Sequence, residues 1–155
     1  TSLPFEAKIF DTAMSMHTAM NIENKEKLFS EARRVLKATG TFGIYDVLQG
    51  EGGEVLYPVP WAREPSISFL SSPNEMAHHL QKAGFKILKT QDTTSSSQQW
   101  FEELAKKLQS GLKPPVTFAV FLGEDFQEMA QNQIRNLKER RILTRSYICK
   151  ISNGV

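Results

Sequence analysis

The sequence has little cysteine, no long apolar run and no large excess of charge of one sign. Cys149 is the only cysteine, so the chain can form neither an internal disulfide nor a cysteine-rich zinc site. Its 19 basic and 17 acidic residues leave a net charge of +2, which gives no electrostatic case for a nucleic acid or a membrane surface as partner. No apolar stretch approaches the roughly 18 residues of a membrane span. We therefore expect a cytoplasmic protein without nucleic-acid or membrane partners.

What the sequence does contain fits one globular domain over residues 1–155, because 40% of the residues are hydrophobic and they are spread along the chain. Apolar runs with β propensity alternate with segments of helical periodicity. This alternation predicts an α/β fold with a mainly parallel sheet whose first strand is a free edge. The predicted strands are 9–16, 41–48, 85–90 and 142–151, and the predicted helices are 24–40, 72–83, 98–109 and 124–140.

Two further segments stand out between these elements. Residues 49–71 hold three glycines and three prolines, so the segment is a long loop, and loops of this length in a compact domain are commonly functional. Residues 95–113 form a predicted helical insertion, in which Trp100 and Leu104 share one face and are interpreted as core.

Several motifs, in their order and spacing, resemble a known family. Leu3-Pro4-Phe5, Phe10-Asp11 and the run Ala32 to Gly40 are similar to the second half of class I S-adenosylmethionine-dependent methyltransferases. Met20-Asn21-Ile22, Tyr45-Asp46-Val47 and the run Pro58 to Arg63 resemble its small-molecule branch, which includes ubiquinone/menaquinone and sarcosine/dimethylglycine methyltransferases.

The resemblance implies a Rossmann-like sheet of strand order 3-2-1-4-5-7-6, of which this chain supplies strands 4, 5, 6 and 7, the last of them antiparallel. It also implies that the glycine-rich loop that holds most of S-adenosylmethionine lies N-terminal to this chain. The cluster Gly50-Glu51-Gly52-Gly53 follows a different strand and does not have the pattern of that loop. We therefore expect the C-terminal portion of a methyltransferase domain, and no activity from this portion alone.

Candidate site residues follow from the position of strand ends, since ligands of open α/β sheets lie at the carboxyl ends of the strands. The resemblance implies that Ser15, Met16 and His17 approach the cofactor. His17 is also the candidate acid or base, because histidine titrates near neutral pH; a surface histidine is the alternative. Asp46 is a second catalytic candidate, and the alternative is a carboxylate bonded to loop amides.

The resemblance places the loop 49–71 on the acceptor side. Tyr57 and Trp61 could enclose a cationic amine, and Arg63 could pair with an acceptor carboxylate. The alternative is that these side chains only hold the loop in place. We expect no metal site, because His78 and His79 are adjacent on a helix and point about 100° apart.

Two functions remain open at this point. The first is methyl transfer to a small-molecule acceptor by the parent protein. The second is a non-catalytic association module, in which the exposed first strand pairs with a second copy or another strand.

Overall fold

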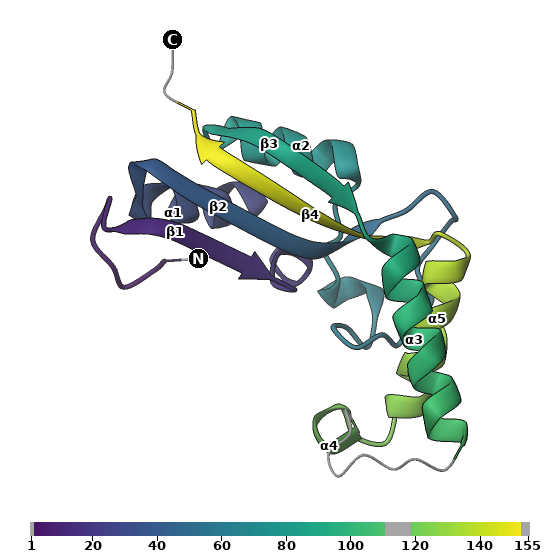
Figure 1. The fold of residues 1–155 in the computed structure, drawn as a ribbon. Helices are drawn as coiled ribbons and strands as arrows, with labels where there is room; N and C mark the ends of the chain where they lie inside the picture. The colour runs from purple at the N-terminus through teal and green to yellow at the C-terminus, as the bar shows by residue number, and fades with distance from the viewer. Residues whose placement is uncertain (1, 111–118, 153–155) are drawn as a thin grey trace.

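The computed structural model describes residues 2–110 and 119–152, which build a four-stranded sheet flanked by helices (Figure 1). The strands lie in the order β1-β2-β4-β3, with β1 parallel to β2 and β4 antiparallel to both of its neighbours. This is the arrangement expected for strands 4, 5, 7 and 6 of the predicted sheet. The strand bounds are β1 Phe10–Met16, β2 Leu36–Gln49, β3 Phe85–Asp92 and β4 Ile142–Ile151.

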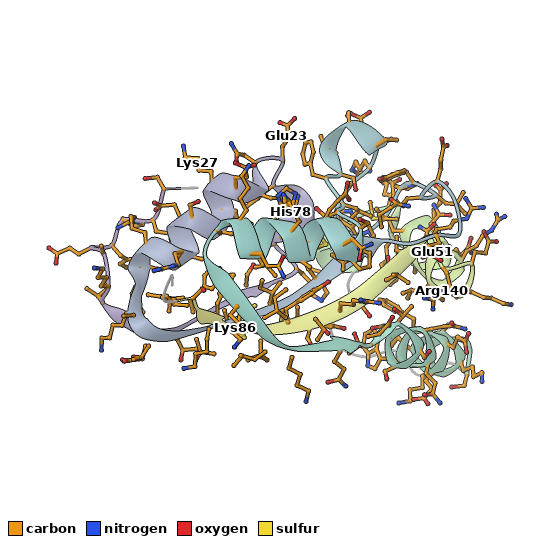
Figure 2. The ribbon with its side chains drawn as sticks, turned by 90° about the horizontal axis from the view of Figure 1, so that it is seen from above. Glu23, Lys27, Glu51, His78, Lys86 and Arg140 are labelled. Atoms are coloured by element: carbon orange, nitrogen blue, oxygen red, sulfur yellow. The ribbon has the colours of Figure 1, made fainter. Side chains whose placement is uncertain are left out.

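One face of the sheet is covered by two helices, α1 (Lys25–Val35) and α2 (Pro73–Lys82), which lie side by side on it (Figure 1). Figure 2 shows both helices on the same side of the strands, with the labelled Lys27 and His78 on them. The strands alternate, so every second side chain of β2 and β4 enters the core beneath these helices. Phe42 of β2 stacks on Phe85 of β3 with ring centroids 5.1 Å apart.

The opposite face of the sheet is uncovered over much of its length by the described residues. Met14 of β1 is 73% exposed and Ile148 of β4 is 40% exposed, and both side chains approach Gly43 of the intervening β2. The outer edge of β1 has no strand beside it within residues 2–110 and 119–152, as the sequence predicts.

The segment between β3 and β4 forms a helical arm at the end of the sheet. Helix α3 (Thr94–Gln109) leaves β3 and packs against α5 (Phe126–Lys138), which returns to β4, with the short α4 (Ala119–Leu122) at the far end (Figure 1). Two single-turn helices complete the described elements, η1 (Ala19–Asn21) and η2 (Pro65–Ile67). None of the described helices is both long enough and apolar enough to cross a membrane.

The predicted boundary between the first helix and the second strand is wrong. Helix α1 ends at Val35, and β2 begins at the next residue, whereas the sequence predicts that Gly40 ends the helix. The register of β1 against β2 shifts between the pairs Phe10–Leu36 and Thr12–Thr41, so extra residues of β2 loop out there. A Cβ at Gly40 would lie 2.8 Å from the carbonyl oxygen of Lys37, so this close approach requires glycine.

Helix α3 also begins earlier than predicted. Residues 94–97, which precede the predicted start at residue 98, form its first turn, and the Asp92 carboxylate accepts a hydrogen bond of 3.0 Å from the Thr94 amide there. The remaining predicted elements match closely. Helix α2 begins with the expected capping box of Ser72 and Glu75, and the predicted last strand coincides with β4. The end of the predicted insertion, residues 111–113, lies outside the described residues.

Candidate functional site

A cavity of about 730 Å³ lies where the carboxyl ends of β1 and β2 meet the helical arm. One wall comes from the sheet and the turn after β1, and the other comes from α3, α5 and the loop 49–71. Such a volume suits an organic molecule of ordinary metabolite or drug size. Its lining residues are His17, Met20, Tyr45, Val47, Pro60, Trp61, Thr93, Ser96, Ser97, Trp100, Phe101, Leu122, Phe126, Ala130, Gln133 and Thr144.

His17 stands in the cavity wall directly after β1. Its backbone amide donates to the carbonyl of Tyr45 at 2.9 Å, which continues the parallel ladder by one residue. Its backbone has a φ of 49°, which turns the chain sharply out of the strand. The imidazole meets the Tyr45 ring edge-on, with centroids 5.0 Å apart. Parallel pairing of two adjacent strands therefore places a titratable group beside a phenol.

Asp46 follows Tyr45 in β2 and points away from the cavity. Its carboxylate is 1% exposed and accepts hydrogen bonds from the amides of Ala19 at 2.7 Å, Val47 at 2.9 Å and Thr18 at 3.2 Å. Burial raises the pKa of this carboxyl group above its ordinary value, although the three amides act in the opposite direction. The structure thus places Asp46 where it fixes the turn that carries His17, and it is not among the lining residues.

Lys25 joins this turn to the loop 49–71. It is 5% exposed, and its ammonium group donates to the carbonyls of Ile22 at 2.5 Å and Phe69 at 2.6 Å. Burial lowers the pKa of the Lys25 ammonium group. The amide of Phe69 also donates to the carbonyl of Met20 at 2.8 Å. These contacts hold the turn after β1 against the loop 49–71.

Two glycines of the loop 49–71 allow the loop backbone to approach the backbone before β4 closely. Gly50 and Gly52 donate to the carbonyls of Arg141 and Arg140 at 2.8 and 2.9 Å, and a Cβ on either glycine would collide with the backbone before β4. Figure 2 shows the labelled Glu51 and Arg140 where the two segments meet. These glycines therefore close the base of the loop, and sequence reasoning gives them no such role.

Helix α5 holds the middle of the same loop. The Asn136 side chain is fully buried and pairs with the backbone of Leu56, accepting from its amide and donating to its carbonyl, both at 2.9 Å. One turn earlier, Asn132 donates to the carbonyl of Pro58 at 3.0 Å. The loop is thus attached to the helix with which it forms one wall of the cavity.

Of the three predicted acceptor-side residues, only Trp61 lines the cavity. Its indole N–H donates to the Ser68 hydroxyl at 3.0 Å, which orients the ring across the loop. Tyr57 is half-buried outside the lining. Arg63 is exposed, and its guanidinium group forms an ion pair with Asp125. The pairing of Arg63 with an acceptor carboxylate therefore has no support from its place in the structure.

Two lining residues escape the sequence interpretation. Trp100 lines the cavity and is half-exposed, whereas the apolar stripe of its helix predicts a core residue. The reason is that α3 packs one side against α5 and turns a different side toward the cavity. Gln133 is 5% exposed, and its side-chain oxygen has no hydrogen-bond partner among the described residues. A single glutamine in a polar helix carries no sequence signal that separates it from Gln127 or Gln131.

The carboxyl end of β1 offers one more feature for a ligand. The Ser15 hydroxyl oxygen is buried without a hydrogen-bond partner in the described part of the chain, and Met16 is 51% exposed. Neither residue belongs to the cavity lining. Within residues 2–110 and 119–152, no group of three or more histidine, cysteine, aspartate or glutamate side chains is arranged to hold a metal ion.

Comparison with known proteins supports the resemblance seen in the motifs. The model of a family described as "Methyltransferase domain" matches residues 1–44. Among curated proteins, none matches the sequence.

Solved structures share the fold at low sequence identity. The cyclase SpnF superposes with a TM-score of 0.69 at 22% identity, covering 99% of this chain and 54% of that one. Geranyl diphosphate C-methyltransferase from Streptomyces coelicolor gives 0.72 at 14% identity, with 97% and 51% covered. A putative sarcosine dimethylglycine methyltransferase from Galdieria sulphuraria gives 0.71 at 17% identity, with 99% and 57% covered.

These matches confirm the predicted Rossmann-like α/β fold and the resemblance to class I methyltransferases. The chain spans about half the length of the solved structures that it matches. One of those structures is called a cyclase, so the fold by itself does not fix the reaction.

Proposed function

We propose that this chain is the acceptor-binding half of an S-adenosylmethionine-dependent methyltransferase that acts on a small molecule. The observation that carries the proposal is the cavity at the carboxyl ends of β1 and β2, with His17 and Tyr45 in its wall. This is the place where open α/β sheets bind ligands. The family match over residues 1–44 supports the reaction class, since it includes β1 and the turn that carries His17.

The residues present fit one side of the cofactor. The unpartnered Ser15 hydroxyl, the exposed Met16 and the backbone of His17 would contact it at the end of β1. When bound, S-adenosylmethionine supplies an electrophilic methyl group. The described residues contain no glycine-rich turn from a strand into a helix, so we place the main cofactor cradle in the part of the protein beyond this chain. That part would pair with the free edge of β1.

The cavity walls, His17 and Asp46 have roles that do not depend on contact with the cofactor. The apolar walls exclude water from the acceptor, and His17 can take a proton from an acceptor atom in the cavity. Asp46 acts through position, because its bonds to the amides of Thr18 and Ala19 hold the turn after His17. Alignment of acceptor and donor is the main contribution that such a displacement requires from a protein.

The test is isothermal titration calorimetry with S-adenosylmethionine on two samples, the 155-residue chain and the protein that includes the residues encoded before Thr1. We expect micromolar binding by the longer protein and binding weaker by about 100-fold or more by the 155-residue chain. Absence of binding by the longer protein contradicts the proposal. Equal binding by both contradicts the placement of the cradle outside this chain.

A second candidate, the association module, is favoured by the free edge of β1 and the exposed Met14 and Met16. In this case a second copy of the chain covers the strand edge and the open sheet face. The two candidates differ in what covers β1. A 155-residue chain that stays monomeric at high concentration contradicts the second candidate and leaves the first intact.

A further inference from the structure

The part of the cavity wall that the structure describes is nearly free of charge, and this restricts the acceptor if the proposed function holds. The described lining contains no aspartate, glutamate, lysine or arginine, and its single titratable base is His17. Most of the wall is aromatic or aliphatic, including both tryptophans of the sequence, Trp61 and Trp100. A ligand that carries a fixed charge would lose its hydration here without gaining a counter-ion.

The polar part of the wall is a chain of hydroxyl groups. Tyr45 Oη lies 3.2 Å from Ser97 Oγ, which lies 2.8 Å from Thr144 Oγ1, and Thr93 Oγ1 is a further 2.8 Å on. The last hydroxyl also lies 3.1 Å from the carbonyl oxygen of Thr144. This series of hydroxyl groups therefore ends on a carbonyl oxygen, which can only accept hydrogen bonds.

The carbonyl oxygen at this end determines which hydroxyl group donates in each hydrogen bond of the series. Thr93 has one hydroxyl proton, and the carbonyl contact is a hydrogen bond only if Thr93 donates it there. Thr144 must then donate to Thr93, Ser97 to Thr144, and Tyr45 to Ser97. The phenol oxygen of Tyr45 thus uses its proton inside the wall, and what it offers a ligand is a lone pair.

Gln133 adds a second acceptor on the opposite wall. Its side-chain oxygen is buried without a partner, a state that costs free energy unless something supplies a donor. The residue lies in α5 and contributes to the cavity lining, so a turn of its side chain toward a ligand would bring this oxygen to a donor. A ligand that carries a hydrogen-bond donor therefore suits both walls.

We infer that the acceptor is an uncharged, mainly apolar molecule that carries hydroxyl groups, bound by Tyr45 Oη and the Gln133 carboxamide. The ligand is a methyl acceptor only if the proposed function holds, but its binding to the cavity does not involve the cofactor. It separates this chain from proteins whose ligands carry permanent charge, among them the geranyl diphosphate enzyme of similar fold.

The two tryptophans make the test direct, because both line the cavity and a ligand there changes their fluorescence. The probes are geraniol, its methyl ether and geranyl diphosphate, which share one apolar chain and differ in donor and charge. We expect geraniol to bind about tenfold tighter than the ether, which lacks the donor, and more tightly still than the diphosphate. Tighter binding of the diphosphate, or equal binding of alcohol and ether, overturns the inference.

Substitutions test whether Tyr45 and Gln133 cause the preference for geraniol over its ether. Gln133→Leu and Tyr45→Phe should each weaken geraniol binding severalfold and leave ether binding unchanged. The matched control is Gln131→Leu on the exposed face of the same helix, which should change neither. Gln133→Leu should not lower the melting temperature, since it removes a buried oxygen that has no partner. Equal loss for both probes would indicate damage to the cavity and contradict the assignment.

The outcomes also separate this inference from the proposed function. If the diphosphate binds best and the longer protein binds S-adenosylmethionine, only the ligand class is wrong. If geraniol binds as expected and the longer protein does not bind S-adenosylmethionine, the methyltransferase proposal is wrong and the ligand class stands.

Discussion

Asp46 shows how strongly the surroundings of a side chain decide its role. Its position at the end of a strand is compatible with catalysis, and its bonds to three backbone amides make it a structural group beside the site. The sequence leaves both interpretations open, because strand periodicity gives the face of the sheet and not the partner. The partner, a turn 27 residues earlier, comes from the parallel pairing of β1 with β2.

Replacing Asp46 tests this role. Asp46→Ala should lower the free energy of unfolding by about 3 kcal/mol, because buried amides lose their acceptor, whereas Asp46→Asn should cost about 1 kcal/mol or less. Urea denaturation at neutral pH measures both. The matched control is Asp11→Ala, whose exposed ion pair with Lys37 should contribute less than about 1 kcal/mol. Equal losses in the two alanine variants would contradict the role.

The same carboxyl group gives a pH dependence with a definite sign. Its pKa is raised in the folded state, so the folded state binds a proton before the unfolded state does as the pH falls. The native protein should therefore gain stability relative to Asp46→Asn as the pH is lowered from neutral toward 4. A difference that stays constant or reverses across this range would contradict the raised pKa.

Cys149 should be chemically silent. It is fully buried in β4, and burial raises the pKa of its thiol from 9.0 to about 11. At pH 8 this reduces the thiolate fraction by about 100-fold. We expect Ellman's reagent to label the native chain only as fast as it unfolds and to label it at once in urea. Stoichiometric labelling of the native chain within minutes would contradict this.

Among the elements, those with strong local signals match their predictions, and those decided by tertiary contact do not. The alternation in residues 142–151 and the capping box at Ser72 are local, and β4 and α2 agree with them. The end of α1 is set by the looped-out residues before Gly40, where β1 and β2 change register. A helix-terminating glycine and a close-contact glycine look the same in the sequence.

At the site, the sequence predicts the strand-end position of His17 but cannot predict the opposite wall. That wall depends on how α3 and α5 pack, which brings Trp100 and Gln133 to the cavity from segments with no distinguishing motif. The series of hydroxyl groups could not be predicted from the sequence either, since it joins residues 45, 93, 97 and 144 from segments that are far apart along the chain.

The loop 49–71 should depend on α5 for its order. Asn136 makes two hydrogen bonds to the Leu56 backbone, and Asn132 makes one to Pro58. Asn136→Ala should speed hydrogen exchange at the Leu56 amide and destabilise the fold by about 2 kcal/mol, and Asn132→Ala should have a smaller effect. Unchanged exchange at Leu56 in Asn136→Ala would show that the loop is held by other contacts.

For the molecule as a whole, the order β1-β2-β4-β3 follows the resemblance, and within the described residues it leaves one sheet face and the outer edge of β1 open. If the 155-residue chain self-associates through this surface, Met14→Lys should shift it toward monomer in light scattering coupled to gel filtration. The control is Val120→Lys, which changes another exposed apolar residue far along the helical arm. Loss of association in the control, or none in Met14→Lys, would place the contact elsewhere.

The separation of the cavity into a sheet wall and a helical wall has an evolutionary consequence. The core beneath α1 and α2 involves other residues than those of α3 and α5 that face the cavity, so mutations in the arm can reshape the ligand space while the sheet keeps its stability. New ligand preferences can therefore arise by drift in one segment between β3 and β4. Descendants of one ancestral scaffold could diverge in what they bind long before their strands diverge.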